Sequence, residues 1–574
     1  MDFFNDGITE EIIFALAKIK ELKVISRTSS FYFKDKSIDI QEIGEQLNVH
    51  LILEGNVRIR KSLLRISAQL IQVKEDAYLW SETWNRKLDD LFDIQDEISL
   101  LIADKIREYT GHLSIADHLV ENQTTNLNAY KHYLKGRYHV NKWNSEDVHI
   151  AVKEFEQAAA LDNQMIDAHV GIADAYSFLA VAGFAPREKA WAKATAALEK
   201  AEAINEHNAG LNYMLANQAF FTKADFATAR KLALKSLANV PTFEASHRLM
   251  TFFYILNGEY QKAKQHLFYA KSVDPLNPET AFYEAFFYYQ TAKYKDALKI
   301  LDKLLEANKM NLPALMVTIH LKIKEGKWQE AQQLIQQTPE EMFALDERLG
   351  LCCLVEITKG NRTPSLLSKL EENGKDTNAH HAHSYLFIIY SMLGEFQKAY
   401  AILQNLFDHQ SSILMIGFTN ILSENIKQTP DYSTYFQKIY PPIKKERKLQ
   451  PLKPQSSNEV STQKDLAKLN AFMTAEQPFL NPTLSLRTLA NSISIHPNQL
   501  SWLLNQVIGK NFNEYINQQR IEHFKKLVVN PSNSHISLLG LAYESGFNSK
   551  TVFNTAFKKE VGMTPKKYQK MHAK

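Results

Sequence analysis

Amide, hydroxyl and lysine side chains recur on one face of two short predicted helices near the end of this 574-residue chain. Groups of this kind hydrogen-bond the base edges that lie in a DNA major groove about 12 Å wide. The chemistry expected of them is therefore recognition of bases, with no bond made or broken. The candidate base-contacting residues are Asn498, Gln499, Ser501, Trp502, Lys550, Thr551, Asn554 and Thr555. The candidate phosphate contacts are Lys510, Lys558 and Lys559.

Each set of candidates belongs to the same local pattern: a short helix, a tight turn and a second helix, which we call the reading helix. The first copy spans 486–504 and the second spans 538–559, with Ser494 and Gly546 as the small residues of the turns. A tight turn sets two helices at a steep angle, so the second can enter a groove while the first braces it. Apolar residues at three-to-four spacing predict a connecting helix over 512–528.

The second copy carries further residues in a recognisable order and spacing. They are Ala542, Gly546-Phe547-Asn548-Ser549, Phe553, Phe557-Lys558-Lys559, Gly562 and Thr564-Pro565. With Gly509 to Phe512, Tyr515-Ile516 and Arg520 after the first copy, the stretch from about 475 to 570 resembles the DNA-binding domain of the AraC family of transcription regulators. The chain departs from the family at Ser501-Trp502, where many members have a basic residue, and at Tyr568-Gln569, where the family has Tyr-Arg.

The AraC resemblance implies particular partners. They are double-stranded promoter DNA, RNA polymerase and, as a further expectation, a second copy of the chain in a homodimer. Charge agrees with DNA as a partner, because residues 466–574 contain 13 Lys and Arg against 5 Asp and Glu, a net of +8. The remaining residues carry 54 against 59, a net of −5. A basic excess alone is typical of a solvated tail, but on two helix-turn-helix patterns it favours salt-sensitive binding of nucleic acid.

Composition argues against several other classes of protein. The two cysteines, Cys352 and Cys353, are adjacent and cannot build a disulfide framework or a cysteine-based zinc site. His380, His381 and His383 lack nearby Cys or acidic ligands at zinc spacing, and the acids between 89 and 97 are typical of a solvated helix start. We expect no enzyme activity, metal or cofactor. No apolar run approaches the roughly 18 to 20 residues that span a bilayer, which predicts a cytoplasmic protein, and the AraC resemblance implies a bacterial one.

The middle of the chain shows a 34-residue period. Phe226, Tyr260, Tyr294 and Trp328 are 34 residues apart, as are Ala229, Ala263, Ala297 and Ala331, and Phe396 and Ala399 continue the phase. Gly258, Gly326, Gly360 and Gly394 share another phase. This pattern resembles the tetratricopeptide repeat, and predicts seven or eight helical pairs over 125–425. Such a stack binds a protein or peptide partner, or serves as a spacer or dimer-forming arm. The aromatic stretch at 283–289 is interpreted mostly as core.

The first 112 residues change character. Residues 9–20 predict a helix, and 23–26, 51–59 and 64–70 predict strands, the last two as a hairpin through Lys61 and Ser62. This part resembles the TolB-like or FlgO-like domain found ahead of tetratricopeptide repeats. The resemblance rests on Phe4, Asp6 to Glu11, Arg27 to Ser30, Ile43-Gly44, Leu53-Glu54-Gly55, Val57-Arg58 and Leu79 to Glu82. That family usually begins with a further strand before the first helix, whereas this chain starts at the helix, so either the native start lies upstream of Met1 or another chain supplies the missing edge.

The sequence therefore predicts a mostly α protein with an α/β domain at 1–112, a tetratricopeptide-repeat α-solenoid at 125–425, a linker at 426–465 and an all-α double helix-turn-helix domain at 466–574. The leading functional hypothesis is a sequence-specific transcription regulator whose two reading helices enter adjacent major grooves. One alternative is a repeat scaffold whose terminal domain binds DNA only non-specifically. Another makes the first domain a receptor for a small molecule or nucleotide.

Overall fold

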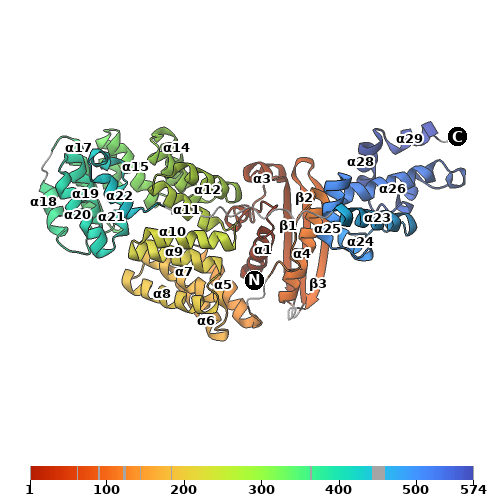
Figure 1. Ribbon diagram of the computed structural model, residues 1–574, viewed down its shortest axis with the longest axis horizontal. Helices are drawn as coiled ribbons and strands as arrows, with labels where there is room; N and C mark the ends of the chain where they lie inside the picture. Colours follow the sequence, from red (N-terminus) through yellow and green to blue (C-terminus); the bar gives the residue numbers. More distant parts are fainter. Residues whose placement is uncertain are drawn as a thin grey trace. The chain divides into compact units, whose positions relative to one another are not determined.

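The computed structural model describes residues 2–60, 63–87, 91–120, 124–142, 144–181, 184–309, 311–361, 365–442 and 459–572. Contacts divide the chain into two compact units. The first comprises Met1–Ile13, Lys23–Asp89 and Asn122–Lys445, and the second comprises Phe14–Leu22, Asp90–Glu121 and Glu446–Lys574. The described residues are mostly helical, as predicted, and contain one three-stranded sheet (Figure 1). No helix within these ranges combines the length and apolar character needed to cross a membrane.

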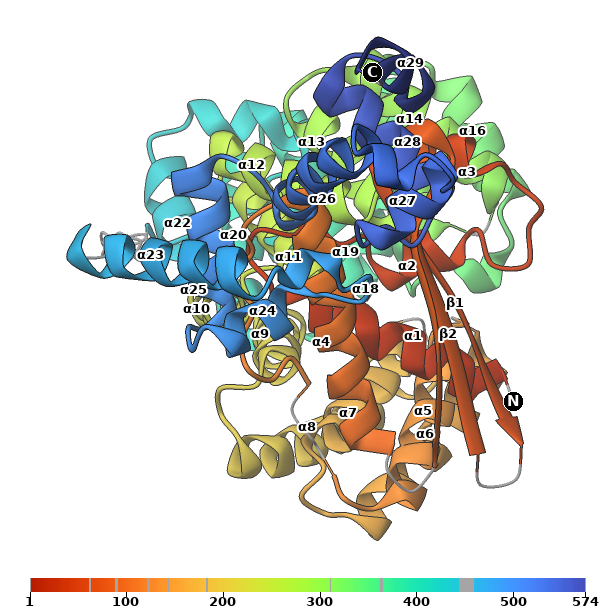
Figure 2. The same ribbon diagram turned by 90° about the vertical axis from the view of Figure 1, so that its right-hand side faces the viewer.

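The sheet of the first unit is an antiparallel meander in the order β1-β2-β3. Its strands are β1 (Leu51–Arg60), β2 (Leu63–Gln72) and β3 (Ala77–Lys87). Arg60 pairs with Leu63, which confirms the predicted hairpin, and Figure 2 shows β1 and β2 side by side. The turn residues Lys61 and Ser62 lie outside the described residues. Helix α1 (Asp2–Ala17) confirms the predicted first helix and begins earlier than expected.

Two strand predictions need correction. Residues 23–26 form no strand, because their backbone is extended towards the solenoid: the Ser26 N–H donates to the Val273 carbonyl at 2.7 Å. Strand β3 was not among the predicted strands, and its only buried residue is Trp84. An edge strand without regular apolar alternation carries little periodic signal.

A buried cluster of polar side chains connects the N-terminal segment to the solenoid. Ser29, in α2 (Arg27–Phe31), donates its Oγ hydrogen to Asp274 Oδ1 at 2.7 Å, and Ser26 donates to the same carboxylate. Arg248 Nη1 lies 3.3 Å from Asp274 Oδ2, and Asp274 is only 1% exposed. A buried carboxylate costs free energy unless it is hydrogen-bonded. These donors therefore make the cluster a specific connection between the N-terminal segment and the solenoid. Helix α3 (Ile40–Leu47) follows, with Asp39 as its N-cap.

Eight consecutive helix pairs, from α5–α6 to α19–α20, form the solenoid within the described residues, which confirms the predicted number (Figure 1). The helices are α5 (Leu127–Val140), α6 (Ser145–Leu161), α7 (Ile166–Val181), α8 (Arg187–Ile204), α9 (Ala209–Lys223), α10 (Phe226–Asn239), α11 (Glu244–Leu256), α12 (Tyr260–Val273), α13 (Pro278–Gln290), α14 (Tyr294–Ala307), α15 (Leu312–Lys324), α16 (Trp328–Gln337), α17 (Glu347–Thr358), α18 (Ser365–Asn373), α19 (His380–Leu393) and α20 (Phe396–His409). They are followed by α21 (Ser412–Phe418), the 3-10 helix η4 (Ile421–Gln428) and α22 (Tyr432–Ile439).

The 34-residue period has two structural causes. The recurring alanines Ala229, Ala263, Ala297, Ala331 and Ala399 are fully buried, where a larger side chain would separate the paired helices. The second cause is a left-handed residue at the end of the first helix of each of six successive pairs. These residues are Ala224, Gly258, Ala292, Gly326, Gly360 and Gly394, all with positive φ. The turn geometry thus recurs even where the residue is alanine.

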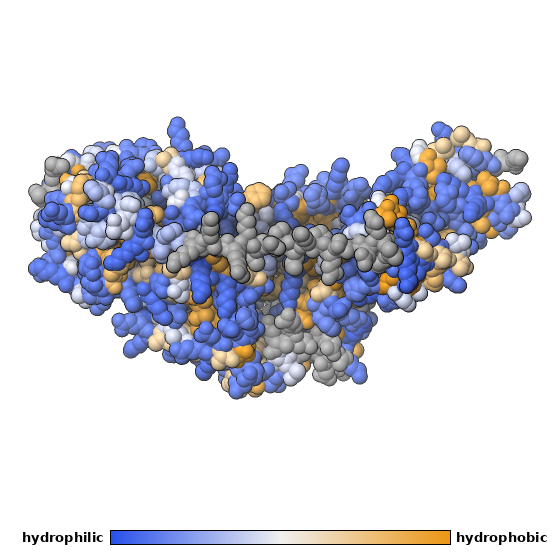
Figure 3. Space-filling view, viewed as in Figure 1, coloured by the Kyte–Doolittle hydropathy of each residue, from blue (hydrophilic) through white to orange (hydrophobic). Residues whose placement is uncertain are grey.

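The aromatic stretch at 283–289 belongs mostly to the solenoid core, as interpreted from the sequence. Phe286 and Tyr289 are buried, and Tyr283, Phe287 and Tyr288 pack against the same core. The solenoid surface visible in Figure 3 is predominantly hydrophilic, with apolar side chains in small groups. Tyr432, Phe436 and Tyr440 also pack on this core, so its packing extends into the residues predicted as linker. Residues 443–458 of that predicted linker lie outside the described residues.

The second unit contains α4 and the C-terminal helices. Their bounds are α4 (Leu91–Thr110), α23 (Glu459–Ala475), α24 (Leu486–Ser492), α25 (Pro497–Trp502), α26 (Phe512–Val528), α27 (Leu538–Glu544), α28 (Lys550–Val561) and α29 (Pro565–His572). Helix α26 confirms the predicted connecting helix. Phe512 and Tyr515 at its start belong to the core around α24 and α25, whereas Ile521 and Phe524 belong to the core around α27 and α28. One helix therefore joins two small cores.

Candidate nucleic-acid interface

The second helix-turn-helix consists of α27, a tight turn and the reading helix α28. Ser537 caps α27 by accepting the Gly540 N–H at 3.0 Å. Phe547, Phe553 and Phe557 are buried; the rings of Phe553 and Phe557 pack on Phe524 of α26, and the ring of Phe547 packs on Phe553. Aromatic contacts of this kind hold α28 by one face. The opposite face is left to solvent.

Gly546 provides the backbone conformation that this turn requires. Its φ is +90°, and a Cβ there would lie 2.2 Å from the carbonyl oxygen of Phe479. The same oxygen accepts a hydrogen bond of 2.7 Å from Nε of Arg520 in α26, which is 8% exposed. Burial lowers the pKa of Arg520 to about 10. Gly546, Phe479 and Arg520 thus join the two helix-turn-helix units at one point.

The exposed face of α28 contains four predicted base contacts, Lys550, Thr551, Asn554 and Thr555. None of these side chains has a hydrogen bond or ion pair within the described residues. Val552 is 41% exposed, because the buried stripe of α28 runs through Phe553 and Phe557. The geometry allows this helix to present donors and acceptors to an incoming surface.

The first helix-turn-helix has the same local design. Ser485 and Thr488 form a capping box at the start of α24, and Ser494 in the turn has a left-handed φ of 53°. The reading helix α25 starts at Pro497 and continues as a π-helix, η6 (Leu503–Ile508). Gln499 is exposed, and its Oε1 accepts the His496 N–H at 3.2 Å. Gln499 therefore acts as a capping side chain in this structure.

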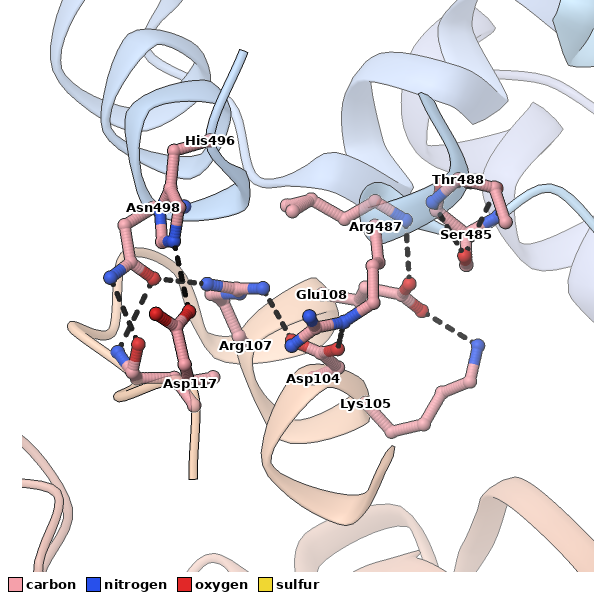
Figure 4. A network of polar contacts seen from close by, with 12 residues as sticks. Asp104, Lys105, Arg107, Glu108, Asp117, Ser485, Arg487, Thr488, His496 and Asn498 are labelled. Atoms are coloured by element: carbon pink, nitrogen blue, oxygen red, sulfur yellow. Dashed lines mark hydrogen bonds and ion pairs between the residues drawn. The ribbon is translucent and has the colours of Figure 1, made fainter. Parts of the chain in front are cut away.

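Two other predicted contacts of the first reading helix, Asn498 and Ser501, bond to an earlier segment of the chain, and Figure 4 shows the contacts of Asn498. Asn498 Oδ1 accepts hydrogen bonds from Arg107 Nη1 at 2.7 Å and from the Ile115 N–H at 3.3 Å. Its Nδ2 donates to the Ile115 carbonyl at 3.0 Å. Ser501 is fully buried, with Oγ 3.3 Å from Nδ1 of His112, and Trp502 is partly buried. The two predicted reading helices thus differ in exposure.

Acidic residues of α4 meet the start of α24. Asp104 Oδ2 accepts from Arg487 Nε at 2.6 Å, and Asp104 also pairs with Arg107. Glu108 Oε1 accepts the Leu486 N–H at 2.9 Å (Figure 4). Burial lowers the pKa of Arg107 and raises that of Glu108. The sequence analysis missed these residues, since an acid-rich amphipathic helix almost four hundred positions away gives no local sign of its partner.

Two of the three predicted phosphate contacts form ion pairs within the domain. Lys559 Nζ lies 2.8 Å from Glu514, whose pKa this hydrogen bond lowers, and Lys510 Nζ lies 3.6 Å from Glu560. Lys558 is exposed. Exposed ion pairs contribute only about 0–1 kcal/mol, so both paired lysines can exchange their carboxylate for a phosphate at little cost.

Comparison with known proteins agrees with this geometry. Residues 489–571 match the family model described as "Helix-turn-helix domain". The C-terminal domain is an AraC-type helix-turn-helix domain. A region of 88 residues is 30% identical to the melibiose operon regulatory protein of Escherichia coli. This region makes up 15% of this chain and 28% of that protein.

A second curated protein and a solved structure are also similar to this chain. A region of 105 residues is 43% identical to the "Putative adenylate cyclase 3" of Rhizobium meliloti, covering 18% of each protein. The chain therefore spans only 18% and 28% of these two curated relatives. The solved tetratricopeptide repeat protein of Parabacteroides merdae is 12% identical over 44% of this chain and 93% of its own, with a TM-score of 0.30. Because this TM-score is low, the assignment of the repeat architecture depends on the helix pairs observed in this structure. The TolB-like or FlgO-like resemblance stays a prediction.

Proposed function

We propose that this chain is a sequence-specific DNA-binding transcription regulator. The observation that carries the proposal is the exposed polar face of α28, held by buried phenylalanines within an AraC-type domain. The net charge of +8 on residues 466–574 supports it, because such an excess favours a phosphate backbone. The name of the Escherichia coli relative, an operon regulatory protein, points to the same class.

In this proposal the reading helices contact bases and the lysines contact phosphates. Lys550, Thr551, Asn554 and Thr555 read one major groove, and Asn498, Gln499, Ser501 and Trp502 read the next. Lys510, Lys558 and Lys559 bind the backbone. An amide bonds adenine in a bidentate manner and a lysine bonds guanine, so these side chains are suited to direct readout. The function involves no enzymatic step.

The remaining domains give the regulator its other contacts. We infer that the solenoid binds a protein or peptide partner, as helical repeat stacks commonly do through their concave surface. RNA polymerase and a second copy of the chain are further proposed partners, and the cytoplasm is the location in which these partners meet promoter DNA. The N-terminal α/β domain would take part in sensing.

Selection of duplexes from a random-sequence library by the full-length protein, at a low and a high salt concentration, tests the proposal. A recovered motif that keeps its preference over scrambled DNA as salt rises supports a sequence-specific regulator. Weak binding that follows salt alone, with no recovered motif, would contradict it, since electrostatic contacts to phosphate carry no sequence information. That result would favour a repeat scaffold.

A further inference from the structure

Residues 91–120, which we call the cover, lie on the first reading helix within the second unit. The cover consists of α4 and the ten residues that follow it. It occupies the Asn498 amide on both sides, through Arg107 and the backbone of Ile115. His112 contacts the buried Ser501 hydroxyl. A DNA base therefore cannot reach either side chain while the cover is in place.

The charge of the cover is complementary to the domain beneath it. Residues 91–120 contain six acidic and two basic residues, against the net of +8 on residues 466–574. Asp104 contacts Arg487, Glu108 accepts the Leu486 N–H, and Asp117 lies 3.3 Å from His496 (Figure 4). Cationic side chains and backbone N–H groups beside a reading helix are the usual donors to DNA phosphates. The cover presents carboxylates to the same kinds of donor.

The cover is a folded element. Asp96 Oδ1 accepts the N–H groups of Leu119 at 2.7 Å and Val120 at 2.9 Å, which returns the segment towards α4. Leu113, Ile115 and Leu119 are 2–4% exposed. Burial of three large aliphatic side chains supplies a substantial hydrophobic contribution to holding the segment. These contacts hold the cover on the domain, and its polar contacts on α25 are of a kind that DNA can replace.

We propose that residues 91–120 are an autoinhibitory cover that competes with duplex DNA for the first reading helix, so that the chain with the cover in place reads DNA through α28 alone. Displacement of the cover exposes Asn498 and Ser501 and permits reading of two adjacent grooves. The inference rests on the proposed DNA binding and adds its regulation. The contrast between α25, which is covered, and α28, whose polar face is exposed, is its structural basis.

The first test is hydrogen exchange of the full-length wild-type protein with and without a duplex that it selects. We expect saturating duplex to accelerate exchange of the amides at 111–117, including the Ile115 N–H that is bonded to Asn498. The amides of α28 serve as the internal reference and become slower. Unchanged or slower exchange at 111–117 with bound DNA would overturn the cover, because it would show a permanent brace.

The second test is a charge-neutralising substitution. Asp104→Asn removes the carboxylate that contacts Arg107 and Arg487, and we expect it to raise affinity for the selected duplex about tenfold, or about 1.4 kcal/mol. The footprint should extend from one major groove to two. Glu544→Gln is the matched control, because it removes one negative charge from the same domain outside the cover. Asp117→Asn, at a side chain that is 81% exposed, gives a smaller gain without disturbing buried groups.

The outcomes separate the cover from DNA binding itself. If the protein selects a motif but Asp104→Asn and Asp117→Asn bind it with the affinity and footprint of the wild-type protein, the cover is overturned while the proposed DNA binding stands. Equal gains in Glu544→Gln and Asp104→Asn also overturn it, since they would reflect general electrostatics. If the wild-type protein and every variant select no motif, the proposed function fails and the cover fails with it.

Discussion

The side-chain amide of Asn498 and the backbone of Ile115 form a reciprocal pair of hydrogen bonds, in which each is both donor and acceptor. Asn554, in the second reading helix, is exposed and has no such partner among the described residues. The two copies of the helix-turn-helix pattern thus differ in whether the side-chain amide of the reading helix is bonded to the chain or exposed. The difference arises from a segment that lies almost four hundred residues earlier in the chain.

Sequence discrimination should depend on the exposed face of α28. We expect Lys550→Ala combined with Asn554→Ala to reduce discrimination at one half-site by about 1–3 kcal/mol per lost base contact. Competition between the selected duplex and duplexes altered at single positions measures this effect. Lys525→Ala, which removes a lysine paired with Glu522 on α26, is the control and should leave discrimination intact. Equal discrimination in the double variant and the wild-type protein would refute the assignment of these two side chains.

The two turns should differ in how substitution changes the stability of the domain. Gly546→Ala would place a Cβ against the Phe479 carbonyl at a φ of +90°, and we expect it to destabilise the domain by about 3 kcal/mol or more. Ser494→Gly relieves a left-handed φ of 53° and should leave stability equal or slightly higher. Urea unfolding of the domain, followed by hydrogen exchange in α26, compares the two. A tolerated Gly546→Ala would show that the turn can adopt another path.

The solenoid turns offer a matched pair of substitutions. Gly258 has a φ of 75°, and a Cβ added there would meet no other atom within 4 Å, so Gly258→Ala changes only backbone strain and should destabilise by about 1 kcal/mol. Ala224 has a φ of 48° at the equivalent position. Ala224→Gly should stabilise by about 0.5–1 kcal/mol, since relief of strain exceeds the added entropy of the unfolded chain. Urea midpoints that shift in the same direction for both variants would contradict the common turn geometry.

Acid should weaken the solenoid through a histidine pair. Nδ1 of His266 lies 2.9 Å from Nδ1 of His247, and burial lowers the pKa of both, that of His266 to about 4. The unfolded chain, with histidine near its usual pKa of about 6.5, binds more protons than the folded chain between these values. Stability is therefore present above about pH 6.5 and falls as the pH drops towards 4, by up to about 3 kcal/mol for His266.

The difference in urea midpoint between neutral pH and about pH 5 measures this loss. His266→Gln keeps a donor for His247 but does not titrate, so it should reduce the pH dependence. Equal pH dependence in His266→Gln and the wild-type protein would assign the acid sensitivity to other groups.

Local patterns predicted much of this fold. The period of 34 residues identified the helix pairs because it arises from contacts between neighbours, a buried alanine and a left-handed turn residue. Gly546 and Ser494 were identified as turn residues for the same reason. The helix at 512–528 followed from its apolar spacing, although the division of its side chains between two cores did not.

The predictions that failed share one physical cause, which is contact between segments that are distant in the sequence. Residues 23–26 have the composition of a strand, but Ser26 bonds to Val273 in the solenoid instead of to the sheet. The predicted base contacts Asn498 and Ser501 were identified by their place in a helix-turn-helix pattern. Their contacts with Arg107, Ile115 and His112 depend on how α4 packs, and an acidic amphipathic helix carries no sequence sign of that partner.

The Ser29–Asp274 hydrogen bond sets an order of events during translation. Its partners are 245 residues apart, so at about 5–20 residues per second the ribosome needs roughly 12 to 50 s after Ser29 to supply Asp274. During that interval the hydroxyl groups of Ser26 and Ser29 remain without their carboxylate. The first segment to leave the ribosome is thus among the later ones to reach its final contacts. It forms them only after the solenoid residues that contain Asp274 have been synthesised.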